Sequence, residues 1–334
     1  MSDRPTIRDV AHRAGVSIAT VSRALNAKDD VSAETRERVQ EAARALGYSV
    51  DPAARALGSQ RTGLVAVVVG DNAGHRDLSL IFFGKVLAAI SRRLGQAGYE
   101  PLLLSTDDSR GALAFGHRFD AAIFIGVDDD DALLAEVAGR HLPVVGVDVR
   151  CELPNTAFVG SDHAGGVQLA LAHLHALGHR RIAHIAGATN TSAGAERLDA
   201  FRSEIDRLCL DPRDQYLRPG DFSSASGYRE TSALLALPEP PTAILAASDL
   251  MALAALQAIW ETGRRPGPDV AVVGFDDLEA AALAHPPLTT IRQDRQELGT
   301  LAATRAIEFV EKPDAPPRTT VLPVELVVRA SSSS

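Results

Sequence analysis

Apolar residues recur every three or four positions in the first fifty residues, a spacing that predicts amphipathic helices. In residues 6–26, TIRDVAHRAGVSIATVSRALN, Val10 and Ala14 share one helical face, and Gly15 then permits a sharp turn. Ser17 is a suitable N-cap for a second helix with its own apolar positions. The pattern predicts two short helices joined by a tight turn, which is a helix-turn-helix.

Two further features complete this N-terminal pattern. Thr6 can cap the first helix, because Asp9 stands three residues later in the position of a capping box. Ser32 can cap a third helix, in which Val39 and its neighbours at helical spacing form an inner face. We therefore expect a small all-α domain in residues 1–50.

From residue 63 onward, the pattern changes to apolar runs separated by longer helical stretches. This alternation is typical of a parallel sheet covered by helices on both faces. We assign to a first sheet the runs LVAVVV at 64–69, PLLLS at 101–105, AAIFIG at 121–126 and PVVGV at 143–147. We assign to a second sheet the runs AFVG at 157–160, IAHIAG at 182–187, TAILAA at 242–247 and DVAVVGF at 269–275. Two α/β subdomains result, and their strands should end at a shared cleft.

Composition and charge differ between the first sixty residues and the rest of the chain. With 334 residues, of which 46% are hydrophobic, the chain can bury a large core and should contain more than one domain. The formal net charge is -9, but residues 1–60 carry 9 Lys+Arg against 8 Asp+Glu, whereas the remainder carries 25 against 35. This split suits a small DNA-contacting module attached to an acidic body that keeps away from phosphate.

Several classes of protein are disfavoured. We find no transmembrane span and no apolar signal segment, so we expect a cytoplasmic protein. The two cysteines, Cys151 and Cys209, form neither a disulfide framework nor a zinc spacing. The carboxylates at 128–131 are more typical of a solvated helix start than of a cation site. We therefore predict no metal and no cofactor, and we treat the final SSSS as a disordered tail.

Motifs for catalysis are also missing from the sequence. It contains no G-x-S-x-G, no paired catalytic carboxylates and no nucleophile with an evident base. The glycine-rich segment GSDHAGG at 160–166 matches neither G-x-G-x-x-G nor a Walker loop. We therefore predict that the protein is not an enzyme.

The second helix carries side chains that suit the major groove of DNA. Ile18, Ala19, Ser22 and Arg23 can face outward when the apolar face packs inward. Arginine can reach guanine edges or phosphates, and small apolar side chains can touch thymine methyls. The alternative is a helical bundle that contacts another protein.

The predicted cleft collects polar side chains that directly follow apolar runs. Asp148, Ser248 and Asp276 each follow a predicted strand, and Arg197 should begin a helix after another. An arginine with carboxylates can grip vicinal hydroxyls, while Phe222 offers an apolar face for a ring. These residues predict a carbohydrate-like site. Each one also has a structural alternative as a helix cap, a turn residue or a core residue.

The residues quoted above, followed by VSAETRERVQEAARALGY, closely resemble the headpiece of the LacI/GalR family of bacterial transcriptional regulators. ALGHRRIAHIAG, TAILAASDLMALAALQAI, DVAVVGFDD, PPLTTIRQD and LPVELVVR resemble the effector-binding core of that family, in the expected order. The resemblance implies a headpiece at 1–50, a hinge at 51–62 and a periplasmic-binding-protein-like core at 63–330. The first subdomain would take 63–160 and 293–320, and the second 161–292 and 321–330.

The resemblance also implies particular site residues. The implied DNA-contacting residues are Thr6, Ser17, Ile18, Ala19, Thr20, Ser22, Arg23, Asn26, Ser32 and Tyr48, together with Ala54 and Leu57 in the hinge. Leu57 would wedge between base steps in the minor groove; the alternative is that it packs on the core. The implied effector-contacting residues are Phe82, Asp148, Arg197, Phe222, Ser248, Asp276 and Gln293. Purine-binding members have a basic residue where this chain has Thr191, which disfavours a purine effector.

We therefore expect a DNA-binding transcriptional repressor that recognises a palindromic operator as a homodimer, or as a tetramer, and responds to a sugar-like effector. The segment at 106–120 is shorter than is usual in the family, which affects the packing of the first subdomain. One alternative is a cytoplasmic sugar-binding sensor that acts through protein contacts. An enzyme on the same scaffold is a third possibility, because a fold does not dictate a function.

Overall fold

The computed structural model divides the chain into two compact units, Met1–Gly63 and Leu64–Ser334. It describes residues 5–25, 31–48, 61–70, 79–105, 119–140, 142–150, 153, 155–211, 213–313 and 316–333. Most of the expected hinge therefore lies outside the described residues, as do Asn26, Ala54, Leu57 and most of the segment at 106–120.

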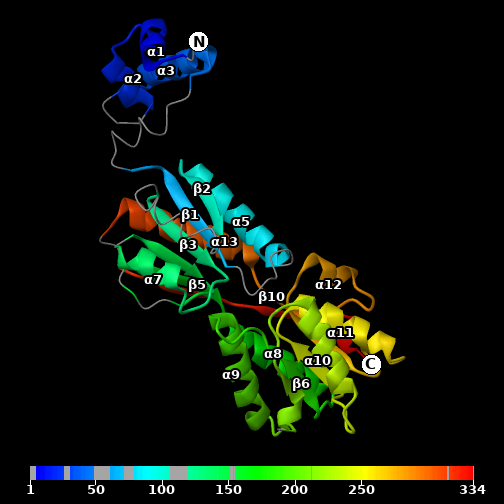
Figure 1. The fold of residues 1–334 in the computed structure, drawn as a ribbon. Coiled ribbons are helices and arrows are strands. Elements are labelled where there is room, and N and C mark those ends of the chain that lie inside the picture. The colour runs from blue at the N-terminus through cyan, green and yellow to red at the C-terminus, as the bar shows by residue number, and fades with distance from the viewer. Residues whose placement is uncertain are drawn as a thin grey trace. The chain divides into compact units, whose positions relative to one another are not determined.

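The N-terminal unit contains the three predicted helices, α1 (Ile7–Ala14), α2 (Ile18–Leu25) and α3 (Ala33–Leu46) (Figure 1). Their apolar faces meet in a small core around Val10, Val21 and Val39, each of which is fully buried. Removing these faces from water is what holds such short helices together, because helices of this length are marginal alone.

The ends of these helices are fixed by the residues that the sequence singled out. The Asp9 carboxylate accepts hydrogen bonds from the backbone N–H and the hydroxyl of Thr6, both at 2.7 Å. The Ser17 hydroxyl oxygen accepts from the N–H of Thr20 at 3.1 Å, and Ser32 caps α3 in the same way. Gly15 ends α1 with a φ of 64°, a left-handed conformation that glycine adopts without steric cost.

The first subdomain of the larger unit is built on a parallel sheet in the order β11-β5-β4-β3-β1-β2. Its strands are β1 (Leu64–Val69), β2 (Glu100–Ser105), β3 (Ala121–Ile125), β4 (Val144–Val147), β5 (Thr156–Ser161) and β11 (Thr319–Leu322). Helices α5 (Ser79–Gln96) and α13 (Arg295–Glu311) pack on one face of the sheet, and α7 (Ala132–Gly139) packs on the other (Figure 1).

The second subdomain repeats this architecture in the order β12-β10-β9-β8-β6-β7, with β12 alone antiparallel among the described strands. Its strands are β6 (Ile182–Ile185), β7 (Leu217–Arg218), β8 (Ala243–Ala246), β9 (Ala271–Asp276), β10 (Thr289–Arg292) and β12 (Glu325–Val327). Helices α8 (His163–Ala176) and α9 (Ser192–Arg207) cover one face, while α10 (Ser224–Leu235) and α11 (Asp249–Glu261) cover the other. The short elements η2 (Asp214–Tyr216), α12 (Glu279–Leu283) and η3 (Ala330–Ser332) complete it.

One strand assignment from the sequence is wrong. The run at 157–160 was expected in the second sheet, but it forms β5 of the first, where Val144 pairs with Thr156 and Phe158 pairs with Thr319. An apolar run that is buried on both faces looks the same in either sheet, so the pattern alone could not place it. Strands β7, β10, β11 and β12 were not predicted, because each is short and none forms a continuous apolar run.

Three short connections pass between the two subdomains. The chain leaves β5 for α8 through residue 162, leaves β10 for α13 through 293–294, and leaves β11 for β12 through 323–324. The C-terminal part of the sequence therefore contributes to both sheets. Among the helices that the structure describes, none is long and apolar enough to cross a membrane.

The C-terminal serines correct another expectation, since they were expected to form a disordered tail. Ser331 and Ser332 are buried in η3 and tie the chain end to the second sheet. The Ser331 hydroxyl donates to the carbonyl of Val272 at 2.6 Å and accepts from the N–H of Thr289 at 2.8 Å. Low sequence complexity did not prevent order, because a serine hydroxyl can satisfy buried backbone groups.

We predict that Ser331→Ala lowers the free energy of unfolding by about 1–3 kcal/mol, because it leaves a buried N–H and a buried carbonyl without their partner. Ser333→Ala is the matched control, since Ser333 is exposed and its change should be nearly neutral. Urea unfolding monitored by circular dichroism measures both effects. Equal stability of the two variants would contradict the role given to Ser331.

Candidate functional site

A cavity of about 130 Å³ lies where strands of the two sheets end, with walls from both subdomains. Six of the seven residues predicted to contact an effector line it: Phe82, Asp148, Arg197, Phe222, Ser248 and Asp276. Its other lining residues are Phe83, Gly126, Val127, Val147, Thr191, Ala193, Asp221, Ser223 and Leu250. The cavity therefore combines apolar walls with a few charged groups, as small-ligand sites commonly do.

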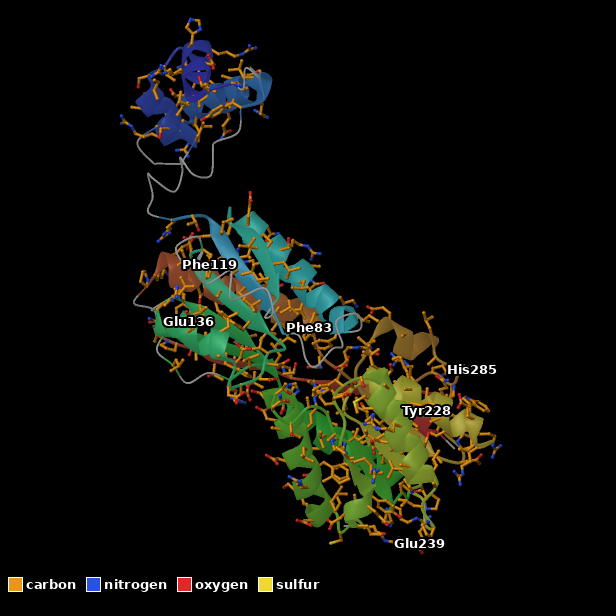
Figure 2. The ribbon with its side chains drawn as sticks, viewed as in Figure 1. Phe83, Phe119, Glu136, Tyr228, Glu239 and His285 are labelled. Carbon is orange, nitrogen blue, oxygen red and sulfur yellow. The ribbon has the colours of Figure 1, made fainter. Side chains whose placement is uncertain are left out.

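The first subdomain contributes an aromatic pair from the start of α5. The rings of Phe82 and Phe83 meet edge to face with centroids 5.2 Å apart, and Figure 2 shows Phe83 on the side of this subdomain toward the second. Gly126 follows β3 and makes room for the second ring, because a Cβ there would lie 2.5 Å from Phe83 Cζ. Phe83 was not predicted to be a site residue, although its position next to the predicted residue Phe82 could have indicated it.

The second subdomain contributes Phe222, which is seated in a similar way. A Cβ at Gly187, just after β6, would lie 2.1 Å from the Phe222 ring. Phe222 itself has a φ of 66°, an uncommon conformation for a bulky residue and one that marks a local constraint. Each subdomain thus presents an aromatic ring to the cavity over a glycine, and such rings suit the apolar face of a sugar.

Arg197 is the buried cation of the site. It lies in the second turn of α9 rather than at the helix start expected from the sequence. Its Nη1 donates to the carbonyl of Ala247, and its Nη2 and Nε lie 3.2 and 3.4 Å from Nδ1 of His163. The guanidinium also stacks 3.7 Å above the ring of Phe275.

Asp148 belongs to the first subdomain and is linked to Arg197 through His163. The Asp148 carboxylate accepts from the backbone N–H of Ser161 at 2.9 Å and lies 3.1 Å from Nε2 of His163. Burial opposes its charge, but the nearby His163 and Arg197 hold the pKa of Asp148 below its usual value. His163 was missed by the sequence analysis, where it appeared only within a glycine-rich segment without a known motif.

Asp276 ends β9 and supplies a second carboxylate. Burial raises the pKa of Asp276 to about 6, although Arg197 and Arg295 oppose that shift. Nε2 of Gln293 donates to Asp276 at 2.8 Å, so Gln293 supports the cavity without lining it. Gln293, which was predicted to contact the effector, therefore lies behind the cavity wall and contacts Asp276.

The neighbours of Asp276 have structural roles. Asp249 is buried and accepts from the N–H of Leu278 at 2.7 Å and from the Thr290 hydroxyl at 2.5 Å. Burial and the adjacent Asp276 raise its pKa well above the ordinary value. The Ser248 hydroxyl oxygen caps α11 by accepting from Met251 at 3.3 Å, so Ser248 is a helix cap as well as part of the cavity wall.

Polar contacts close the cleft on one side. Ser192, the first residue of α9, donates to Asp129 of the first subdomain at 2.6 Å. Arg150 of the first subdomain forms an ion pair with Glu196 at 2.6 Å. Asp131 caps α7, so the carboxylate run at 128–131 has structural roles. Among the described residues, no group of three or more His, Cys, Asp or Glu could hold a metal ion.

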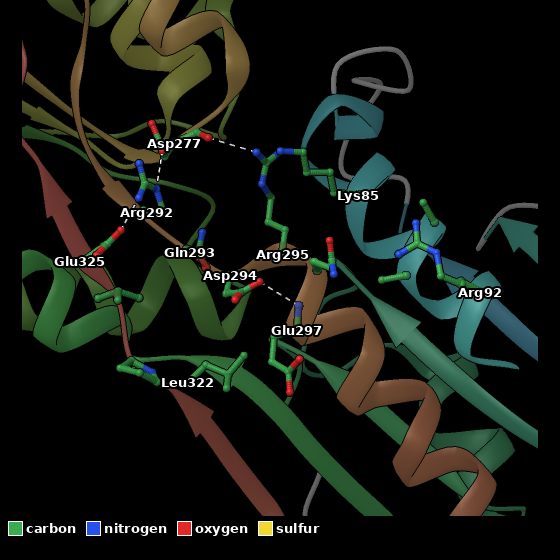
Figure 3. Close-up of a pocket in the computed structure, with 15 residues that line it drawn as sticks. Lys85, Arg92, Asp277, Arg292, Gln293, Asp294, Arg295, Glu297, Leu322 and Glu325 are labelled. Atoms are coloured by element: carbon green, nitrogen blue, oxygen red, sulfur yellow. Dashed lines mark hydrogen bonds and ion pairs between the residues drawn. The ribbon is translucent and has the colours of Figure 1, made fainter. Parts of the chain in front are cut away.

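A larger groove of about 870 Å³ lies between α5 and the start of α13, on the side of the connections between subdomains (Figure 3). Several of its charged side chains already have partners. Arg292 contacts Asp277 at 2.6 Å and also contacts Glu325, while Lys85 pairs with Glu279. Because Lys85, Asp277, Arg292 and Glu325 are paired in this way, and because aromatic rings join the charged groups around Arg197, the smaller cavity is the better candidate for ligand binding.

The N-terminal unit presents the predicted DNA-contacting residues in several ways. On α2, Ile18, Ala19 and Arg23 are exposed, while Thr20 and Ser22 are half-buried. Thr6, Ser17 and Ser32 are exposed and act as helix caps, and Tyr48 packs partly against the core. The exposed side of α2 therefore carries an arginine beside small and apolar side chains, the combination expected of a recognition helix.

Residues 6–51 match the family described as bacterial regulatory proteins, lacI family, and residues 171–332 match the periplasmic binding protein-like domain. The lactose operon repressor of Escherichia coli is 35% identical over 335 residues, which cover 98% of this chain and 90% of that protein. The chain belongs to the LacI family. Another relative, the HTH-type transcriptional regulator CelR of Thermobifida fusca, is 34% identical over 98% of each chain.

Solved structures of the LacI family agree over the same length. The lac repressor dimer bound to operator and the anti-inducer ONPF has a TM-score of 0.83 with 33% identity, covering 99% of this chain and 100% of that one. The CelR–cellobiose complex has a TM-score of 0.76 with 32% identity, covering 98% and 100%. This LacI-family chain is a transcriptional regulator rather than an enzyme, which confirms the predicted family, fold class and function class.

One buried residue beside the site of this LacI-family chain yields a pH prediction. Burial lowers the pKa of His184 to about 4. An unfolded chain binds that proton near pH 6.5, so the free energy of unfolding should fall as the pH drops from about 6.5 to about 4, by roughly 3 kcal/mol from His184 alone. His184→Leu should remove this component.

Urea unfolding of both proteins at about pH 7 and about pH 5 measures the prediction. The difference between wild type and His184→Leu isolates the histidine, because Asp276 and the other titrating groups contribute to both proteins. An identical pH dependence of the two would show that His184 does not resist protonation.

Proposed function

We propose that this LacI-family regulator represses transcription in the cytoplasm by binding a palindromic operator as a homodimer, and that a sugar or sugar derivative controls its affinity for DNA. The observation that carries the proposal is the cavity at the strand ends, where one buried arginine, two carboxylates and aromatic rings from both subdomains converge. The relatives described above support the proposed dimer, operator and sugar effector, since one is a lac repressor dimer on its operator and another is a cellobiose complex.

On the DNA side, α2 is proposed as the recognition helix. Ile18 and Ala19 would touch thymine methyls, and Arg23 would reach a guanine edge or a phosphate. The exposed caps Thr6, Ser17 and Ser32 stand at helix starts, where backbone N–H groups attract phosphate. Thr20, Ser22, Asn26 and Tyr48 are proposed as further contacts. Ala54 and Leu57 stay proposed hinge contacts in the minor groove.

On the effector side, Asp148 and Asp276 would accept hydrogen bonds from ligand hydroxyls, and Arg197 would donate to them. Phe82 and Phe222 would pack on apolar faces of the ligand, while Ser248 and Gln293 would complete or support the wall. A polyhydroxylated ring satisfies both kinds of surface, because it has hydroxyls at its rim and C–H groups on its faces.

The coupling between the two sites is proposed to pass through the cleft. An effector that binds one arrangement of the subdomains more tightly shifts the population toward it. The contacts of Arg150 with Glu196 and of Asp129 with Ser192 favour a closed cleft in this structure. Altered spacing of the paired subdomains would then change how two headpieces fit two half-sites of DNA.

We predict that Arg23→Ala weakens operator binding by about 1–3 kcal/mol if Arg23 reads a base, while effector binding is unchanged. Fluorescence anisotropy with operator and random duplexes measures the loss. Arg44→Ala is the matched control, since it removes the same charge from exposed α3 rather than from α2. Equal losses in the two variants would remove Arg23 from the specific contacts.

We predict that Arg197→Ala and Asp276→Asn each abolish the effector response and leave operator affinity within a few-fold of wild type. A thermal-shift screen comes first, with cellobiose, ONPG and other saccharides, and with hypoxanthine as the purine probe. A ligand at a hundredfold excess over its dissociation constant adds about 2.7 kcal/mol, which is a shift of a few degrees.

Asp277→Asn is the control for this experiment. Asp277 is the next residue along the chain, but its carboxylate pairs with Arg292 and Arg329 and does not line the cavity. It should keep the ligand-induced shift even if its own stability falls. A full response in the Arg197 and Asp276 variants, or a stabilising purine with no stabilising saccharide, would contradict the proposed effector site.

A further inference from the structure

His163 stands at a place in the fold where few residues could contact both subdomains. It is the first residue of α8, two positions after the last residue of β5. Strand β5 belongs to the first sheet, whereas α8 packs on the second. His163 therefore lies directly at one of the connections between the subdomains, and its side chain is 1% exposed.

The two ring nitrogens of His163 face different subdomains. Nε2 is 3.1 Å from the carboxylate of Asp148, which belongs to the loop after β4. Nδ1 is 3.2 Å from Nη2 and 3.4 Å from Nε of Arg197 on α9. The ring thus links a carboxylate of the first subdomain to the guanidinium of the second.

The identity of these partners fixes the chemical form of the ring. A guanidinium has only donors, so Nδ1 of His163 must accept and carries no proton. A neutral imidazole then has its proton on Nε2, where Asp148 is the acceptor. Protonation of both nitrogens would remove the acceptor that Arg197 requires, so the geometry selects the neutral Nε2–H tautomer.

This tautomer determines how Arg197 is presented to the cavity. Of the five N–H donors of a guanidinium, one on Nη1 is taken by Ala247 and those on Nε and one on Nη2 are taken by His163. The plane of the group is held over Phe275. One donor on each Nη remains for a ligand.

We infer that His163 is a positioning residue of the effector site, which orients Arg197 and Asp148 toward one ligand across the boundary between the subdomains. The inference rests on the proposed effector role of those two residues. His163 does not line the cavity, so it acts through its partners. The competing role is that of an ordinary buried histidine that contributes only to folding.

His184 provides a matched control for that competing role. It is also fully buried and also lies in the second subdomain, but it stacks on Phe201 and its Nδ1 is 2.9 Å from the carbonyl of Leu245. A carbonyl can only accept, so His184 carries its proton on Nδ1. The structure therefore assigns opposite tautomers to two buried histidines of the same protein.

The first test is nitrogen-15 NMR of the full-length protein labelled at histidine, with His163→Leu and His184→Leu used to assign the signals by their loss. At neutral pH, His163 should give the pattern of the Nε2–H tautomer and His184 that of the Nδ1–H tautomer. An Nδ1–H tautomer or a doubly protonated ring at His163 would overturn the inference. This experiment needs no effector.

The second test compares His163→Leu with His163→Gln, whose amide keeps one donor and one acceptor. The Nε–H signal of Arg197 should lose its protection from solvent exchange in His163→Leu and recover it at least in part in His163→Gln. His184→Leu should leave that signal unchanged. A protected Arg197 signal in folded His163→Leu would show that the guanidinium is held without His163.

Cellobiose is the probe for the binding arm of the experiment. We expect His163→Leu to bind it about tenfold more weakly or worse, as for loss of a hydrogen bond to a charged group, with partial recovery in His163→Gln and no change in His184→Leu. Equal affinity of all three variants and the wild type would overturn the inference. If wild type does not bind cellobiose, the choice of that sugar fails, while the NMR arms still decide the role of His163.

Discussion

The charge of Arg197 is the constraint around which the larger unit is organised. A guanidinium removed from water loses hydration that must be replaced by acceptors and by nearby negative charge. Burial accordingly lowers the pKa of Arg197, while Asp276, Asp148 and Asp249 oppose that shift. These groups come from distant parts of the sequence. The charge can be satisfied only when both sheets are formed and their carboxyl ends meet.

The carboxylates around this charge are not equivalent. The positive groups and donors around Asp148 lower its pKa, whereas burial raises the pKa of Asp276 and of Asp249. The negative charge of Asp276 adds to the effect of burial on Asp249. A ligand with hydroxyl donors in the cavity would add a donor to Asp276, which lines the cavity, and so favour its ionised form.

Most of the fold could be predicted from the sequence, because its longer helices and its buried strands each show a clear apolar pattern. The caps Thr6, Ser17 and Ser32 and the main strands followed from local physical chemistry. The position of β5 did not, since its burial is the same in either sheet. Asp148, Arg197 and Asp276 were predictable from their places after strands. His163 was not, because its importance depends on two partners brought to it by tertiary structure alone.

The three short connections between the subdomains have a mechanical consequence. Each consists of one or two residues, a length of chain that spans only a few ångströms even when fully extended. Three such connections at one boundary prevent the subdomains from sliding apart. The remaining relative motions are bending and twisting about these connections. Gln293 belongs to one connection, and His163 is adjacent to another. Small torsional changes at these residues therefore act close to the axis of the motion. The displacement that they cause grows with distance from the axis, toward the far end of each subdomain.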